Sequence, residues 1–195
     1  MAIFKAQNLI NMKSKKIFII VISLVTCLSL SKTYAQFSAG VELGLPMGNF
    51  SDISNIGFGG SVRYEGSIKN KLNWTASIGY LSFSGKTFTV NNVSIPFGNS
   101  AIVPITGGIK YYFSGANDGF YGTADLSLNF VSFYVYSYNS GNGGGYNLAS
   151  ANESRLGFAP GIGYRTGNWD FSGKFNLISD LNYFGLRAAY IFGGK

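Results

Sequence analysis

Residues 156–177 read LGFAPGIGYRTGNWDFSGKFNL, and this stretch decides the class of fold. Apolar residues recur at alternate positions from Leu156 to Tyr164 and again from Trp169 to Leu177, and the positions between them hold small, polar or charged residues. Side chains of a β-strand point alternately to its two faces, so a period of two predicts a strand. The intervening Thr-Gly-Asn is typical of a tight turn, and the stretch therefore predicts a β-hairpin.

The same alternation recurs along most of the chain. It predicts eight strands of about 9–13 residues, over residues 37–45, 58–66, 72–80, 101–113, 120–130, 155–165, 169–177 and 184–192. Connections of more than ten residues alternate with connections of roughly three to six, and the last loop is short. Outer-membrane barrels alternate long extracellular loops with short periplasmic turns in this way. We therefore predict an all-β fold, an eight-stranded antiparallel up-and-down transmembrane β-barrel over residues 36–195.

The first 35 residues have a different composition. They hold five lysines and no acid, and residues 17–30 form an apolar run of 14 residues, too short for a comfortable transmembrane helix of about 20. Thr33 and Ala35 are small residues at the −3 and −1 positions of a signal-peptide cleavage site between Ala35 and Gln36. We predict an N-terminal signal helix over residues 1–35, with Met12 as an alternative start. An uncleaved anchor and a lipoprotein site at Cys27 are competing interpretations.

Composition limits the chemistry that the chain can perform. The 195 residues contain no histidine and one cysteine, which excludes His-based catalytic triads, His-ligated metals, intrachain disulfides and Cys-based zinc sites. The net charge of +7 comes largely from the signal segment, because residues 36–195 hold ten bases and eight acids. The net positive charge of the chain therefore gives no argument for a nucleic-acid partner. We predict no catalytic residue, no metal and no cofactor.

Charged residues of the predicted strands share one face. Lipid-facing positions of a membrane barrel must be apolar, because an Arg or Lys at the bilayer midplane costs about 2–4 kcal/mol. Eight strands leave room for side chains inside but not for a wide aqueous pore. We therefore expect a polar network in the lumen, formed by Glu42, Arg63, Glu65, Lys110, Asp125, Arg155, Arg165, Asp170, Lys174 and Arg187. An ordinary half-buried sheet with its charges in water would show the same alternation.

Aromatic residues gather near the predicted strand ends, as expected for rings at the two headgroup levels of a membrane. The girdle predicted at the periplasmic end comprises Phe37, Trp74, Tyr111, Phe113, Phe120, Tyr164, Trp169, Tyr190 and Phe192. A second group at the other end comprises Tyr80, Phe83, Phe133, Tyr134, Tyr136, Tyr138 and Tyr183.

Five segments carry a resemblance to a known family: GVELGLPMGNFSD, SIGYLSFSGKTF, GGIKYYFSG, GFAPGIGYRTGNWDFSGKFN and YFGLRAAYIFGGK. They resemble the outer-membrane-protein β-barrel domain family, small eight-stranded porin-like barrels similar to the OmpA transmembrane domain. The resemblance implies residence in the outer membrane of a Gram-negative cell envelope, contact with outer-membrane lipid, and assembly by the barrel-assembly machinery. The last predicted strand resembles the signal read by that machinery, although the chain continues beyond its final aromatic residue to Lys195.

These observations favour a monomeric, non-enzymatic outer-membrane protein with a structural role or a surface role through its extracellular loops. A narrow porin-like channel for small solutes or ions is the alternative. A soluble lipocalin-like binder is a third interpretation, and it predicts the reverse arrangement, with apolar side chains inside and polar ones outside.

Overall fold

The computed structural model describes residues 36–90, 93–96, 98–114, 117–139 and 145–192. The predicted signal helix, with Met12, Cys27 and Ala35, lies outside the described residues, and Gln36 is the first described residue. Within the described ranges, no helix is long and apolar enough to cross a membrane.

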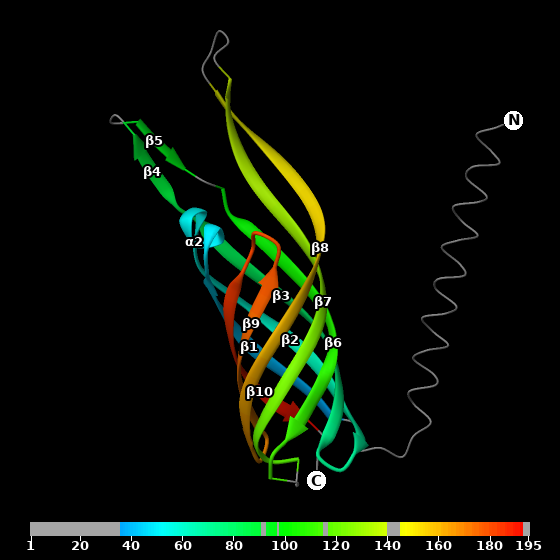
Figure 1. Cartoon of the computed structure of the whole chain (residues 1–195). Coiled ribbons are helices and arrows are strands. Elements are labelled where there is room, and N and C mark those ends of the chain that lie inside the picture. Colours follow the sequence, from blue (N-terminus) through cyan, green and yellow to red (C-terminus); the bar gives the residue numbers. More distant parts are fainter. Residues whose placement is uncertain (1–35, 91–92, 97, 115–116, 140–144, 193–195) are drawn as a thin grey trace, which may run out of the picture. The chain divides into compact units, whose positions relative to one another are not determined.

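Eight strands close into one barrel, in the order β1-β10-β9-β8-β7-β6-β3-β2, and every neighbouring pair is antiparallel (Figure 1). The strands are β1 Gln36–Pro46, β2 Ser54–Lys69, β3 Leu72–Gly85, β6 Ser100–Tyr112, β7 Gly119–Asn139, β8 Gly145–Thr166, β9 Trp169–Ile178 and β10 Tyr183–Phe192. The first and last strands pair with each other, from Phe37 opposite Phe192 to Pro46 opposite Tyr183. The predicted eight-stranded up-and-down barrel is confirmed.

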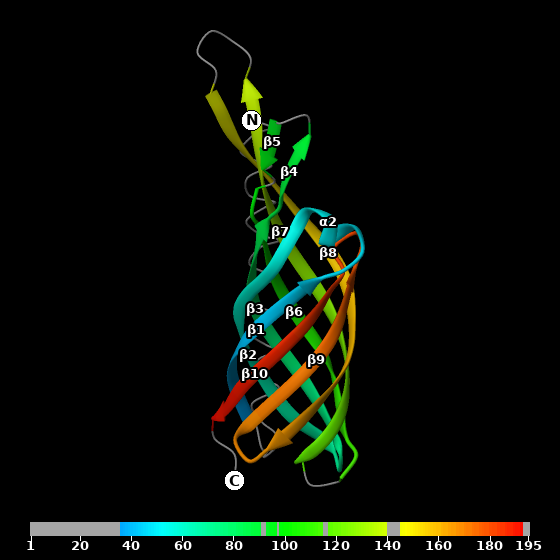
Figure 2. The same cartoon turned by 90° about the vertical axis from the view of Figure 1, so that its left-hand side faces the viewer.

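The two ends of the barrel differ. At the end where β1 starts and β10 stops, which we call the terminal end, the connections are short (Figures 1 and 2). Lys71 and Gly167 adopt positive φ angles of 70° and 55° in two of these turns, as tight hairpin turns require. The opposite end, the loop end, carries the helix α2 (Asn49–Ile53), the separate hairpin of β4 (Thr87–Val90) and β5 (Val93–Pro96), and the end of β7 with the start of β8.

Strands β7 and β8 are much longer than the sequence indicated. Pairing of β7 with β6 ends at Phe133, and β8 pairs with β9 only from Gly157 onward, yet β7 and β8 stay paired to Asn139 opposite Gly145. They form a two-stranded ribbon that rises beyond the barrel (Figure 2). The long connection expected between the fifth and sixth barrel strands is therefore paired strand up to Asn139 and again from Gly145. Residues 131–138 (VSFYVYSY) are rich in the β-branched and aromatic residues that favour strands.

The outer face of the barrel is free of charge over the described barrel strands between the terminal turns and the loop-end rim. Large apolar side chains stand out from it on every barrel strand. Examples are Val41, Phe58, Ile78, Ile105, Leu126, Ile162, Phe171 and Leu186, each more than a third exposed. This surface is the reverse of a water-soluble barrel, whose exposed face carries the charges.

Candidate functional site in the barrel interior

An ion-pair cluster fills the barrel near its terminal end. Lys110 on β6 is fully buried, and its Nζ donates to Glu65 Oε2 at 2.8 Å and to Asp170 Oδ2 at 2.7 Å. Tyr112 Oη donates to Glu65 Oε1 at 2.9 Å, and Tyr121 Oη donates to Asp170 Oδ1 at 2.7 Å. The Lys110 ammonium also lies 4.0 Å from the centre of the Tyr121 ring. One lysine thus bridges two carboxylates, and each carboxylate also accepts a hydrogen bond from one tyrosine.

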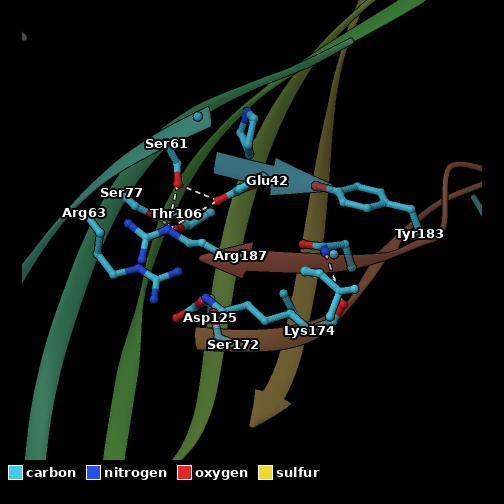
Figure 3. A pocket seen from close by; sticks show the side chains of 16 residues that line it. Glu42, Ser61, Arg63, Ser77, Thr106, Asp125, Ser172, Lys174, Tyr183 and Arg187 are labelled. Carbon is cyan, nitrogen blue, oxygen red and sulfur yellow. Dashed lines mark hydrogen bonds and ion pairs between the residues drawn. The ribbon is translucent and has the colours of Figure 1, made fainter. Parts of the chain in front are cut away.

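The middle of the barrel holds a second group of charges. Lys174 on β9 pairs with Asp125 on β7, which also accepts from Thr75 Oγ1 at 3.3 Å. Arg187 Nε lies 3.6 Å from Glu42 Oε1 and donates to Ser61 Oγ at 2.9 Å. Glu42 and Arg187 lie opposite each other on the paired strands β1 and β10, whereas Lys174 and Asp125 lie on strands separated by β8. Glu42, Ser61, Asp125, Lys174 and Arg187 line a cavity that we call the central chamber (Figure 3).

Two of the interior arginines lie apart from these ion pairs. Arg63 is buried at the central chamber, and the described residues place no carboxylate within 4.0 Å of it. Arg165 is buried near the terminal turn, where its Nε contacts the Gly167 carbonyl oxygen at 3.5 Å.

Arg155 also stands outside the interior groups. It lies at the loop-end rim, where its Nη2 is 2.7 Å from Glu153 Oε2 and its Nη1 is 3.7 Å from Asp180 Oδ2. Its partners are largely exposed to solvent. Arg187 Nη1 lies 3.9 Å from Asp170 Oδ1 and so links the Arg187–Glu42 pair to the ion-pair cluster around Lys110, whereas Arg155 forms its ion pairs at the rim.

An apolar plug closes the loop end of the barrel. Its buried members are Phe50, Leu81, Phe83, Ile102, Val131, Ile178, Leu181 and Tyr183. Helix α2 carries Phe50, whose ring lies 4.9 Å from that of Phe83, and Phe83 in turn lies 5.5 Å from Tyr183. Phenyl rings in this tilted arrangement attract one another beyond the area that they bury. The plug seals the mouth above the central chamber.

The plug corrects the expectation of a second aromatic belt. Phe83 and Tyr183 are buried inside the barrel, and Phe133 packs against the plug rather than standing on the outer surface. Phe83 continues the inward alternation of β3, so the pattern could have placed it inside. Tyr80 and Tyr134 are exposed, and the side chains of Tyr136 and Tyr138 lie outside the described ones.

The aromatic residues predicted for the periplasmic girdle lie on the outer face at the terminal end. Eight of them are more than a third exposed, and Trp74 is half-buried. Rings on adjacent strands meet, with centroids 4.7 Å apart for Phe120 and Tyr164 and 5.5 Å apart for Trp169 and Tyr190. Every barrel strand except β2 contributes to the set, and the register pairs Phe37 with Phe192, Tyr190 with Trp169 and Phe120 with Tyr164.

Metal and cofactor chemistry finds no support in the interior. Among the residues that the structure describes, no group of three or more His, Cys, Asp or Glu side chains could hold a metal ion. The interior carboxylates are each engaged by a lysine or arginine. The arrangement is suited to holding the strands together rather than to exposing a reactive group.

Comparison with known proteins supports the architecture. No protein-family model matches the chain, and no curated protein matches it in sequence. Ail, the attachment invasion locus protein of Yersinia pestis, in complex with the heparin analogue sucrose octasulfate, matches at 12% identity with a TM-score of 0.54. The backbone structure of the same protein in a phospholipid bilayer nanodisc matches at 14% identity with a TM-score of 0.50. Each match covers 83% of this chain and 100% of the Ail chain. The chain thus has the fold of a small eight-stranded outer-membrane β-barrel.

Proposed function

We propose that this chain is an integral outer-membrane protein, monomeric and without enzymatic activity, that acts structurally or through the surface of its loop end. The observation that carries the proposal is the distribution of charge over the barrel. Charged side chains of the barrel strands point inward or lie at the rim, while the outer face presents an uncharged apolar surface on every side.

The size of the apolar surface argues for a lipid environment. Monomeric soluble proteins rarely expose a contiguous apolar patch larger than a few hundred Å². Here apolar side chains stand out from all eight barrel strands, from Val41 on β1 to Leu186 on β10. A soluble lipocalin-like binder would need the opposite arrangement, so the observed polarity counts against that interpretation. A closed sheet also leaves no unpaired strand edge, which a bilayer demands.

The aromatic girdle and the short turns support a position and an orientation in the membrane. Tyr and Trp rings favour the headgroup level of a membrane, and the girdle at the terminal end provides them on adjacent strands. Outer-membrane barrels have short periplasmic turns and longer extracellular loops, so the terminal end would face the periplasm and the loop end the outside of the cell. Assembly by the barrel-assembly machinery follows from the same reasoning about outer-membrane residence.

The filled interior favours a non-conducting barrel over a channel. A solute crossing the lumen would have to displace the apolar plug at one end and the ion-pair cluster around Lys110 at the other. We therefore expect no steady conductance in planar-bilayer recordings of the purified protein. A steady, voltage-independent conductance would favour the narrow channel instead.

Cell fractionation tests the proposal. The full chain, expressed in a Gram-negative host, is expected in the outer-membrane fraction and should migrate differently in detergent gels before and after boiling. Light scattering in detergent should give the mass of one chain. Recovery of folded protein from the soluble periplasm would refute the proposal, whereas a dimer in detergent would overturn only the monomeric state.

A further inference from the structure

The central chamber is a polar cavity of about 40 Å³ inside the barrel. A water molecule needs about 10–15 Å³ of such volume, so the chamber has room for a few small species and not for a large solute. Its charged walls are Glu42, Arg63, Asp125, Lys174 and Arg187. Figure 3 shows Arg63 and Arg187 reaching from β2 and β10 toward one another in this space.

Two guanidinium groups in the chamber have N–H groups without partners. Arg63 is 5% exposed, and neither its Nε nor its Nη1 has a hydrogen-bond partner. Arg187 is also 5% exposed, and its Nη1 has no hydrogen-bond partner, with Asp170 Oδ1 3.9 Å away. The hydroxyl of Ser172, on the same chamber wall, has no partner either. Buried polar groups of native proteins are almost always hydrogen-bonded, so these atoms call for an acceptor.

The balance of charge says what kind of acceptor is missing. The chamber walls carry three bases (Arg63, Lys174 and Arg187) against two acids (Glu42 and Asp125), a net charge of +1. Each of these acids already has a basic partner within 4.0 Å. Burial of an uncompensated charge is costly, and a negative ion would satisfy the free donors and remove the excess charge together.

We propose that the central chamber binds one small monovalent anion of chloride size, held between the guanidinium groups of Arg63 and Arg187 and within reach of the Ser172 hydroxyl. The small volume of the cavity favours a small ion. The carboxylates of Glu42 and Asp125 on the same walls disfavour a doubly charged ion by repulsion. The site sits between the apolar plug and the ion-pair cluster, so a bound ion is shielded from bulk solvent.

Equilibrium unfolding of the full barrel in detergent tests the site, because a ligand that binds only the folded state raises the unfolding midpoint. The denaturant midpoint is measured in sodium chloride and in sodium gluconate at equal ionic strength, gluconate being too large for the chamber. We expect a higher midpoint in chloride for the wild-type protein. Arg63→Met should remove this difference, and the matched control Arg155→Met at the rim should retain it.

Crystallography of the wild-type protein provides a measurement that does not depend on any variant folding. Protein refolded and crystallised in sodium bromide should show an anomalous peak between Arg63 and Arg187. A chamber that contains water alone, with no anomalous peak, would overturn the proposal. So would a chloride effect that is equal in the wild-type protein and Arg63→Met, because it would then arise outside the chamber. A result of either kind leaves the membrane location untouched, since fractionation tests that separately.

Discussion

Replacement of Leu126 by arginine tests whether the outer face of the barrel meets lipid. Leu126 lies on β7, points outward and is 69% exposed. It stands six positions from Phe120 of the aromatic girdle, which corresponds to about 20 Å along a strand at a rise of about 3.4 Å per residue. A strand tilt of about 40° reduces this to about 15 Å along the barrel axis. Leu126 therefore lies close to the middle of an apolar band about 25–30 Å tall.

The expected cost follows from that depth. An arginine on the lipid face at the bilayer midplane destabilises a barrel by about 2–4 kcal/mol, and near the interface the cost falls to about 0–1 kcal/mol. On a surface in water, a substitution of an exposed residue usually stays within about 0.5 kcal/mol. The matched control is Ile68→Arg, because Ile68 is 56% exposed and neighbours Lys69 at the terminal end of β2.

The assay is reversible denaturant unfolding of both variants from phospholipid vesicles, with the free energy taken from the linear dependence on denaturant. We expect Leu126→Arg to lower the free energy of unfolding by about 2–4 kcal/mol and Ile68→Arg by less than about 1 kcal/mol. If both variants change it by less than about 0.5 kcal/mol, the outer face does not lie in hydrocarbon and the reasoning fails.

Three further changes probe the interior. Lys110→Met leaves two buried carboxylates without their base and should cost about 3–5 kcal/mol of unfolding free energy, whereas Arg155→Gln, at an exposed pair, should cost less than about 1 kcal/mol. Phe83→Ala removes the centre of the apolar plug and should cost about 3–5 kcal/mol. Gly108→Ala should cost about 1–3 kcal/mol, because its Cβ would collide with the Ala124 carbonyl oxygen and with Asp125. Gly107→Ala, with open space around its Cβ, should be neutral or slightly stabilising.

Denaturant titration in the same vesicles checks all three, and the paired variants serve as controls. Equal costs for the lysine and the rim arginine would mean that the ion-pair cluster is hydrated rather than buried. A plug variant as stable as the wild-type protein would show that the loop end is loosely packed. Equal effects at the two adjacent glycines would contradict the inward and outward assignment of β6.

The barrel could be predicted from the sequence because side chains of a strand alternate between the inner and the outer face, and this alternation is visible in each predicted strand. The same alternation places Glu42, Lys110 and Asp125 on the inner face. It did not predict which charges pair, because Arg187 meets Glu42 only once the last strand lies beside the first. That neighbourhood is set by closure of the barrel and by its shear, not by local residues.

The apolar plug was not predicted from the sequence, for two different reasons. Leu81 and Phe83 continue the inward alternation of β3 and could have been found by extending it toward the loop. Phe50 belongs to a five-residue helix in a connection, and no local pattern says that this helix folds over the mouth. The ribbon of β7 and β8 was not predicted, because the glycine-rich stretch 141–145 is typical of a loop, whereas residues 131–138 favour a strand.

The barrel is closed by the pairing of its first strand, β1, with its last strand, β10. Loss of β10 would remove the partner of β1 and of β9 together, and would take Arg187 away from Glu42. Strands β1 and β9 would then each present a row of unpaired backbone N–H and C=O groups, and such exposed strand edges promote aggregation. Cooperative folding therefore has to wait for the last strand, so a nascent chain depends on being kept unfolded until its synthesis is complete.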